Sequence, residues 1–280
     1  MPGSRAIKPS KLPKKQSRYE LILCWIFAKN YQPGDEHVSW DREELNTAAD
    51  AVGVVRIKNL GDAVYRYRFR ADMPIAISDT APTGKEWIIR GAGNARYRFD
   101  LIPQQIPIKP NRSLVVTKIP DATPEIITAA ALTDEQALLA KVRYNRLIDI
   151  FLGVASYSLQ NHLRTKVDEV GQVEVDEIYA AVDRYGRQFI LPVQAKGGSD
   201  RLGITQTEQD MAACAAKWPG MICRNISVQF AGDVIALFDL TVQDDRVVIR
   251  REAHYKLVPA GEITAEDLYS YGLAAGPDSD

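Results

Sequence analysis

The sequence of residues 173–210 is VEVDEIYAAVDRYGRQFILPVQAKGGSDRLGITQTEQD, and its pattern determines how the second half of the chain is expected to fold. Two mainly apolar runs flank the polar segment Asp183–Gly186, whose residues are typical of a tight turn. This pattern predicts an antiparallel hairpin. Asp176 in the first strand should then lie opposite a residue between Val193 and Lys196 in the second.

Polar side chains collect at one end of this predicted hairpin. Side chains two residues apart share a face of a strand, so we expect Glu174 and Asp176 to point the same way. For the same reason Gln194 and Lys196 should share a face. Asp176 and Gln194 offer oxygen ligands for Mg²⁺, and Lys196 can hold the attacking water or a phosphate. The set suits metal-assisted hydrolysis of a phosphodiester; the alternative is a structural salt bridge between Asp176 and Lys196.

A helix is expected directly after the hairpin. Residues 205–208, TQTE, match a capping box, which predicts a helix from Thr205 to about Lys217. On such a helix Gln206, Gln209 and Asp210 form one polar face near the end of the hairpin.

Together these residues resemble the PD-(D/E)XK nuclease superfamily, the fold of many restriction endonucleases and Holliday-junction resolvases. The resemblance covers residues 134–258 and rests on Glu174-Val175-Asp176, the hairpin, Gln194-Ala195-Lys196 and the helix that opens with Gln206. It implies a mixed sheet flanked by helices, with Mg²⁺ as cofactor and Mn²⁺ as an alternative. It also implies that Asp176 binds the metal, that Gln194 shares it, and that Lys196 serves the attacking water.

The glutamine at position 194 departs from the Glu or Asp that is commonest in the family. A QxK triplet is similar to the Mrr-type branch, but it leaves one negative charge missing unless Glu174 or Glu177 supplies it as a further metal ligand. The sequence therefore predicts that Gln194→Glu tightens Mg²⁺ binding. Gln206 resembles a glutamine that several branches place beside the site.

The first hundred residues are expected to contact DNA. Residues 1–18 contain six Lys or Arg and no acid, which indicates a disordered basic arm that follows phosphates or only solubilises the chain. Helices are predicted over residues 17–30 and from Asp41, followed by a strand over Val64–Arg70 and a hairpin around Gly91–Asn94. A winged-helix-like α+β module at residues 19–102 fits this order, with a plain α+β scaffold as the alternative. The arginines expected to contact DNA are Arg66, Arg68, Arg70, Arg90, Arg96, Arg98 and, in a later loop, Arg201.

The remaining segments complete a two-domain α/β protein. Five prolines make residues 103–132 the expected linker, and a long helix over residues 133–166, bent near Gly153, should open the nuclease domain at 133–260. Strands are predicted over 226–230, 234–240 and 247–257, and residues 261–280 form an acidic tail. The expected fold class is α/β, a restriction-endonuclease-like mixed sheet flanked by helices.

Composition limits the environment and the partners. The net charge of the 280 residues is −1, so attraction to nucleic acid must come from local patches. No apolar run reaches the length of a membrane span, and three scattered cysteines favour a reducing compartment, so we expect a cytoplasmic protein without membrane contact.

The sequence thus predicts a Mg²⁺-dependent DNA endonuclease, similar to a type II restriction enzyme, that acts on double-stranded DNA in restriction or defence. One alternative is an inactive nuclease-fold protein that binds DNA as a regulator or structural subunit, with Gln194 as the lesion. A lone carboxylate at Asp176 would favour it, and Glu174, Glu177 or Asp149 could supply a second one. A repair or junction-resolving nuclease is the other alternative. If the arginines prove silent, the N-terminal region becomes a dimerisation scaffold, so a homodimer is also among the expected assemblies.

Overall fold

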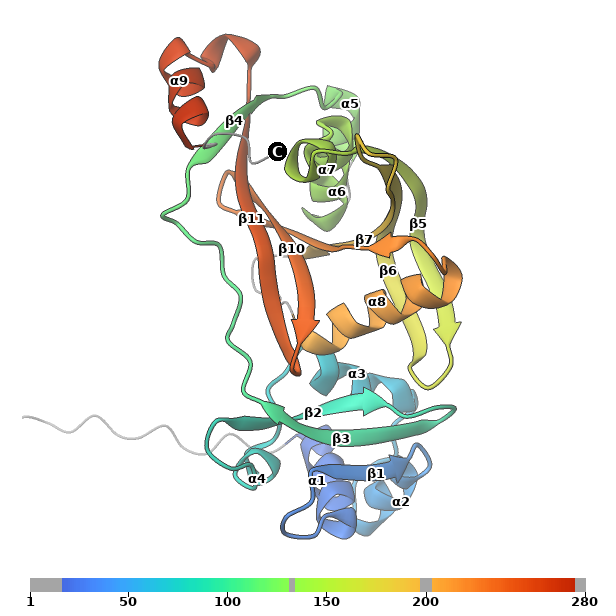
Figure 1. The fold of residues 1–280 in the computed structure, drawn as a ribbon. Coiled ribbons are helices and arrows are strands. Elements are labelled where there is room, and N and C mark those ends of the chain that lie inside the picture. Colours follow the sequence, from blue (N-terminus) through green and yellow to red (C-terminus); the bar gives the residue numbers. More distant parts are fainter. Residues whose placement is uncertain (1–16, 131–133, 197–202, 275–280) are drawn as a thin grey trace, which may run out of the picture.

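A computed structural model describes residues 17–130, 134–196 and 203–274. The chain forms two lobes, with the blue and teal N-terminal module below a larger lobe built on a long twisted sheet (Figure 1). Helix α8 (Ile204–Lys217) lies between that sheet and the module, and it contacts both. Within the described ranges, no helix is long and apolar enough to cross a membrane.

The N-terminal module packs helices on a small antiparallel sheet. Ser17 caps the first helix, because its Oγ accepts the Glu20 N–H at 3.2 Å. The sheet has the order β1-β3-β2, and its core centres on Phe27, Trp87 and Phe99, whose rings meet edge to face. The elements are α1 (Arg18–Asn30), β1 (His37–Asp41), α2 (Glu44–Ala51), α3 (Leu60–Phe69), α4 (Ile75–Ser78), β2 (Lys85–Gly91) and β3 (Arg96–Pro103).

The predicted strand over residues 64–70 is wrong, because this segment belongs to helix α3. Asn59 caps the helix through its side chain, and Leu60, Val64 and Tyr67 recur at helical spacing toward the core. The alternation of aromatic residues and arginine from Val64 onward is therefore not a strand pattern. The helix predicted from Asp41 begins later, at Glu44, since Asp41 ends β1.

The predicted linker contributes to the second lobe. Its residues 116–120 form strand β4, which pairs in parallel with β11 at one edge of the large sheet. The main order across this sheet is β4-β11-β10-β9-β7-β6-β5, so β5 forms the other edge. The elements are β4 (Val116–Pro120), α5 (Glu125–Ala130), α6 (Asp134–Tyr144), α7 (Leu147–Leu152), β5 (Ala155–Val167), β6 (Gly171–Val182), β7 (Gln188–Lys196), β8 (Ile222–Cys223), β9 (Asn225–Ala231), β10 (Val234–Gln243) and β11 (Arg246–Val258). The large mixed sheet flanked by helices confirms the α/β class and the three late strands.

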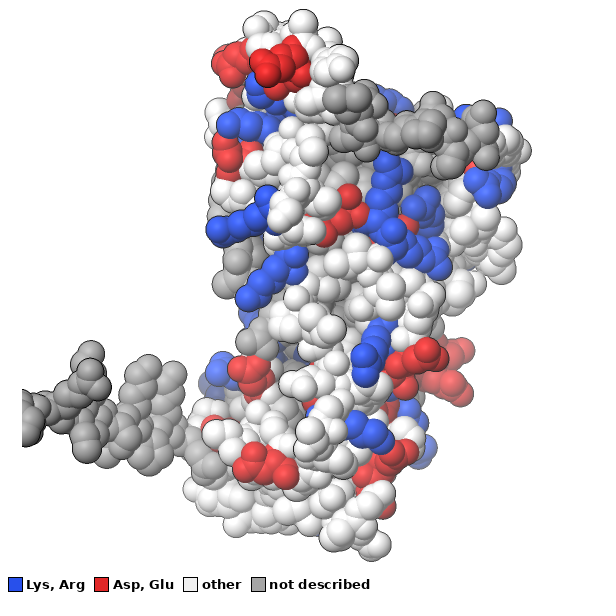
Figure 2. Space-filling model, turned by 60° about the vertical axis from the view of Figure 1, so that its left-hand side comes forward, with Lys and Arg blue, Asp and Glu red and all other residues white. Residues whose placement is uncertain are grey.

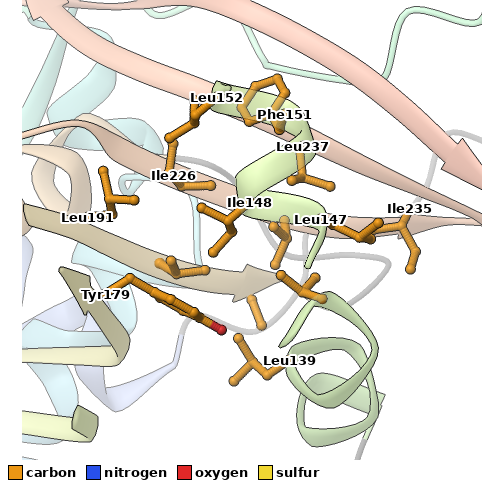
Figure 3. Packing of buried hydrophobic residues seen from close by; sticks show 14 of the residues in the cluster. Leu139, Leu147, Ile148, Phe151, Leu152, Tyr179, Leu191, Ile226, Ile235 and Leu237 are labelled. Carbon is orange, nitrogen blue, oxygen red and sulfur yellow. The ribbon is translucent and has the colours of Figure 1, made fainter. Parts of the chain in front are cut away.

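Two apolar layers hold the large sheet between its helices. On one face α7 packs through Ile148 and Phe151, and α6 through Leu139, against Ile226 and Leu237 of the strands (Figure 3). On the other face Ala213 and Cys214 of α8 pack against apolar side chains of β5, β6 and β7. Because α8 connects β7 to the parallel strand β9, its N-terminus lies beside the end of β7 at Lys196.

The predicted helix over residues 133–166 is wrong beyond its first half. Helix α7 ends at Leu152, and the following Gly153 has a φ of 66°, the left-handed conformation common after a helix. Residues 155–167 continue as the edge strand β5, where Leu159 is 53% exposed. Residues 157–162 of this strand are all exposed, so its sequence lacks the apolar alternation that would predict a strand.

The capping box and the tail also differ from expectation. Helix α8 begins at Ile204 after Gly203, and Thr207 Oγ1 donates back to the Gly203 carbonyl, so residues 205–208 lie inside the helix. The tail contains a short 3₁₀ turn, η1 (Ala260–Glu262), and helix α9 (Ala265–Ala274). Lys118 Nζ contacts Asp267 Oδ2 at 2.9 Å and fixes α9 to β4. Residues 1–16 of the basic arm, Arg201 and residues 275–280 lie outside the described residues.

The lobes touch where two hairpins meet. Gly93 N–H in the β2–β3 turn donates to Glu169 O at 3.2 Å, and a Cβ at Gly91 would lie only 2.1 Å from Val170 O. Gly91→Ala should therefore push the hairpins apart and lower the free energy of unfolding by about 1–3 kcal/mol. Gly261→Ala is the control, because a Cβ there meets nothing within 4 Å. Urea unfolding of both variants checks this prediction, and equal midpoints would contradict it.

Candidate active site

The hairpin of β6 and β7 brings the predicted acid and the QxK triplet together. Glu177 pairs with Val193, so Asp176 comes next to Gln194 across the strands, within the expected range. Asp176 Oδ2 accepts the Ala195 N–H at 2.9 Å, which fixes the carboxylate at the end of β7. Lys196 follows directly and makes no ion pair within the described part of the chain.

Regular strand alternation breaks at Asp176. Val175 packs toward α8, whereas Glu177, two residues later, contacts Arg143 of α6 on the opposite face. The alternation of side chains in the partner strand β5 also shifts opposite Asp176. There His162, between the paired residues Asn161 and Leu163, has a φ of 48°. A left-handed non-glycine residue in a strand is strained, and such strain gathers at functional sites. His162 was not among the residues predicted from the sequence.

Two glutamine amides converge on a backbone carbonyl and a buried carboxylate. Gln194 Nε2 lies 3.2 Å from Glu174 O and 3.2 Å from Asp210 Oδ1. Gln206 Nε2 contacts the same two atoms at 3.3 Å and 2.9 Å. A carbonyl oxygen only accepts hydrogen bonds, so the nitrogen of each amide must face it. The carbonyl oxygens of both amides are therefore turned away from Asp210.

Asp210 is the buried centre of this network. Its side chain is fully enclosed, and Oδ2 also accepts from Asn225 Nδ2 at 3.3 Å. Burial raises the pKa of Asp210 to about 7, although the three amide donors and Lys196 oppose the rise. The sequence placed Asp210 on the polar face of the helix but gave no sign of its burial.

Asp176 also lies in a low-dielectric environment. Burial raises its pKa, and the nearby Glu174 carboxylate adds to the rise. The Ala195 N–H, Lys196 and His162 act in the opposite direction. Asp176 therefore has the Glu174 carboxylate, Lys196 and His162 around it, on one side of the same cleft.

The site opens into a large cleft between the lobes. Its volume is about 1450 Å³, and it is lined by His162, Asp176 and Lys196 on one side and by Arg42, Tyr65 and Arg68 of the module on the other. Basic and acidic side chains are interspersed over the face shown in Figure 2, so no large area of one sign covers that face. Attraction of a polyanion would have to act locally, as within this cleft.

Two further predicted acids lie elsewhere. Glu177 is fully buried on the α6 face, where Oε1 accepts from Arg143 and Ser158. Asp149 accepts the Ser156 N–H and pairs with Arg146 at 3.0 Å. Neither lies at Asp176, whereas Glu174 acts on its charge.

The arginines of the module are used in different ways. Arg90 contacts Asp100, Glu208 and Asp245 within 3.1 Å and links the module to α8 and the β10–β11 turn. Arg98 also binds Asp100, and Arg96 lies 3.6 Å from Asp41. On α3, Arg66 and Arg70 are exposed, whereas Arg68 is partly buried.

The donor set at the site fits Mg²⁺. Glu174, whose carboxylate pairs with Arg164 at 3.0 Å, and Asp176 could supply carboxylates and Gln194 an amide oxygen, all of them hard ligands. Among the described residues, no three His, Cys, Asp or Glu side chains form a preformed metal cluster. Mg²⁺ commonly binds only one or two protein carboxylates and completes its coordination with waters or phosphate oxygens. Two carboxylates and an amide oxygen are therefore enough for such a site.

Comparisons of this chain with protein-family models, with curated proteins and with solved structures give no match.

The raised pKa of Asp210 predicts an unusual pH dependence of stability. Between about pH 4 and 7 the folded protein retains a proton that the unfolded chain has lost, so stability should fall as pH rises through this window, by a few kcal/mol. Above about pH 7 this contribution becomes constant. Asp210→Asn should remove it, so its stability relative to wild type should increase with pH. Urea unfolding in EDTA tests this, and parallel pH profiles for the two proteins would contradict it.

Proposed function

We propose that the protein is a Mg²⁺-dependent DNA endonuclease of the PD-(D/E)XK type that acts in restriction or defence. The observation that carries the proposal is the meeting of Asp176, Gln194 and Lys196 at one end of a hairpin that faces a wide cleft. The β6–β7 hairpin followed by helix α8 agrees with the elements on which the resemblance rests.

Each residue has a separate part in the proposed reaction. Asp176, Glu174 and Gln194 would hold the Mg²⁺, which when bound polarises the phosphate and lowers the pKa of water. Lys196 reaches the cleft next to Asp176, where its ammonium group can position the attacking water and offset charge on the phosphate. Gln206 lines the cleft beside them, with its amide orientation fixed by Asp210.

The main rival is a nuclease-fold protein that binds DNA without cutting it. That function would be favoured by a single carboxylate at Asp176, but Glu174 is close enough to act on the Asp176 charge. Asp210 places a further carboxylate against Gln194, which lacks a charge of its own. This arrangement favours the active enzyme. The N-terminal module, with helices α1 to α4, a hairpin and the cleft-lining Arg68 on α3, supports a winged-helix-like role in DNA contact.

Incubation of supercoiled plasmid with the full chain, with and without Mg²⁺, tests the proposal. We expect nicked or linear products that appear only with the metal and disappear on addition of EDTA. Binding of the same plasmid without any cleavage, in Mg²⁺ and in Mn²⁺, would favour the rival. A preference for branched over linear duplex would favour the junction-resolving nuclease.

A further inference from the structure

Arg68 lies in the wall of the cleft, where its guanidinium stacks over the Phe69 ring at 5.1 Å without a counter-ion among the described residues. It forms no ion pair with any described residue, and its Nε is enclosed without a hydrogen bond. Burial lowers its pKa to about 10, and the nearby Tyr97 and Glu208 only partly compensate. Glu208 itself binds Arg90 through both of its oxygens. A largely desolvated guanidinium without a counter-ion is costly, so its retention points to an anion that is bound in function.

Arg42 repeats this arrangement nearby. Its Nε is also enclosed without a hydrogen-bond partner, and it lines the same cleft. Both arginines lie against the start of β3: the Arg42 N–H donates to Ala95 O at 2.8 Å, and Tyr97 acts on Arg68. Two enclosed guanidinium groups from the module therefore share the cleft with Asp176 and Lys196 of the other lobe.

We propose that Arg68 and Arg42 form a phosphate-binding site that holds the backbone of duplex DNA in the cleft between the lobes. Guanidinium groups donate forked hydrogen bonds to phosphate oxygens, and enclosure strengthens such bonds. A chain of phosphates suits the cleft, whose lining includes more Lys and Arg than Asp and Glu among its described residues. The DNA would pass between α3 and the β6–β7 hairpin, which brings a phosphodiester to the candidate active site.

The exposed face of α3 is not part of this site. Arg66 lies on the same helix, two residues before Arg68, but it is exposed and does not line the cleft. A DNA path through the cleft uses Arg68 and leaves Arg66 free. This inference rests on the proposed function only for the choice of DNA as the anion.

Fluorescence anisotropy with a labelled DNA duplex in EDTA, at several salt concentrations, tests the site on the full chain. Arg68→Gln should weaken binding about tenfold and lower the salt slope by about one unit, because one phosphate contact is lost. Adding Arg42→Gln should lower the DNA affinity and the salt slope further. The matched control Arg66→Gln should change neither. Equal effects of Arg66→Gln and Arg68→Gln, or no effect of either, would overturn the site.

Thermal unfolding separates this role from a structural one. Arg68→Met removes an unpaired enclosed charge, so its Tm should equal or exceed that of the wild type. A lower Tm accompanied by weaker binding would assign Arg68 to packing and overturn the proposal. Arg68-dependent DNA binding without any plasmid cleavage would refute the nuclease but leave this site standing. Plasmid cleavage that does not depend on Arg68 would leave the nuclease proposal standing and refute this phosphate site.

Discussion

Lys196→Ala and Asp176→Ala should each reduce plasmid cleavage about 10³-fold or more while duplex binding stays close to that of the wild type. In the proposed reaction Lys196 would act on the water or the phosphate and Asp176 would hold the metal, so neither would be needed to dock the duplex. Asp176 also accepts the Ala195 N–H, and Asp176→Asn is therefore the milder companion variant, since its amide oxygen can keep that bond.

Lys217→Ala is the matched control for the lysine. Lys217 lies in the last turn of α8, exposed and outside the cleft, so its loss should leave cleavage unchanged. Initial rates on supercoiled plasmid and anisotropy in EDTA provide the two measurements. Cleavage retained within a few-fold by both the Lys196 and the Asp176 variants would remove these residues from the active site.

The hairpin and α8 could be predicted because their information is local. A tight turn at Asp183–Gly186 sets the register of β6 and β7, and strand alternation then brings Asp176 close to Gln194. Contacts distant in sequence gave no such signal. The burial of Asp210 depends on Asn225 and Gln194 coming from two other strands, and the parallel pairing of β4 with β11 joins segments more than a hundred residues apart.

Two errors come from patterns that are shared by helices and strands. The alternation from Val64 to Arg70 resembles a half-buried strand, but the apolar spacing begins earlier, at Leu60, and has a helical period. The edge strand β5 shows the reverse problem, since its exposed polar residues carry no apolar pattern at all. The left-handed His162 could not be predicted either, because this conformation arises where the alternation of both strands shifts at Asp176.

Gln194→Glu should destabilise the protein, although the sequence alone predicts that it tightens Mg²⁺ binding. Gln194 donates to Glu174 O and to Asp210 Oδ1, so a carboxylate in its place would face an oxygen in both directions. The loss of two hydrogen bonds and the like-charge contact should lower the free energy of unfolding by about 2–4 kcal/mol at pH 8. Without metal, the folded variant should therefore be less stable than the wild type, whatever its affinity for Mg²⁺.

Adding Asp210→Asn to Gln194→Glu should restore at least half of that loss. The asparagine amide introduced on α8 can donate to the new carboxylate, and the double variant keeps the charge of the wild type while moving it from α8 to β7. The contact with Glu174 O is not relieved, so recovery should be incomplete. Urea unfolding in EDTA of the wild type, both single variants and the double variant forms a double-mutant cycle that measures the coupling. Additive losses would show that residues 194 and 210 do not interact, and that Asp210 does not set the orientation of the amide beside Asp176.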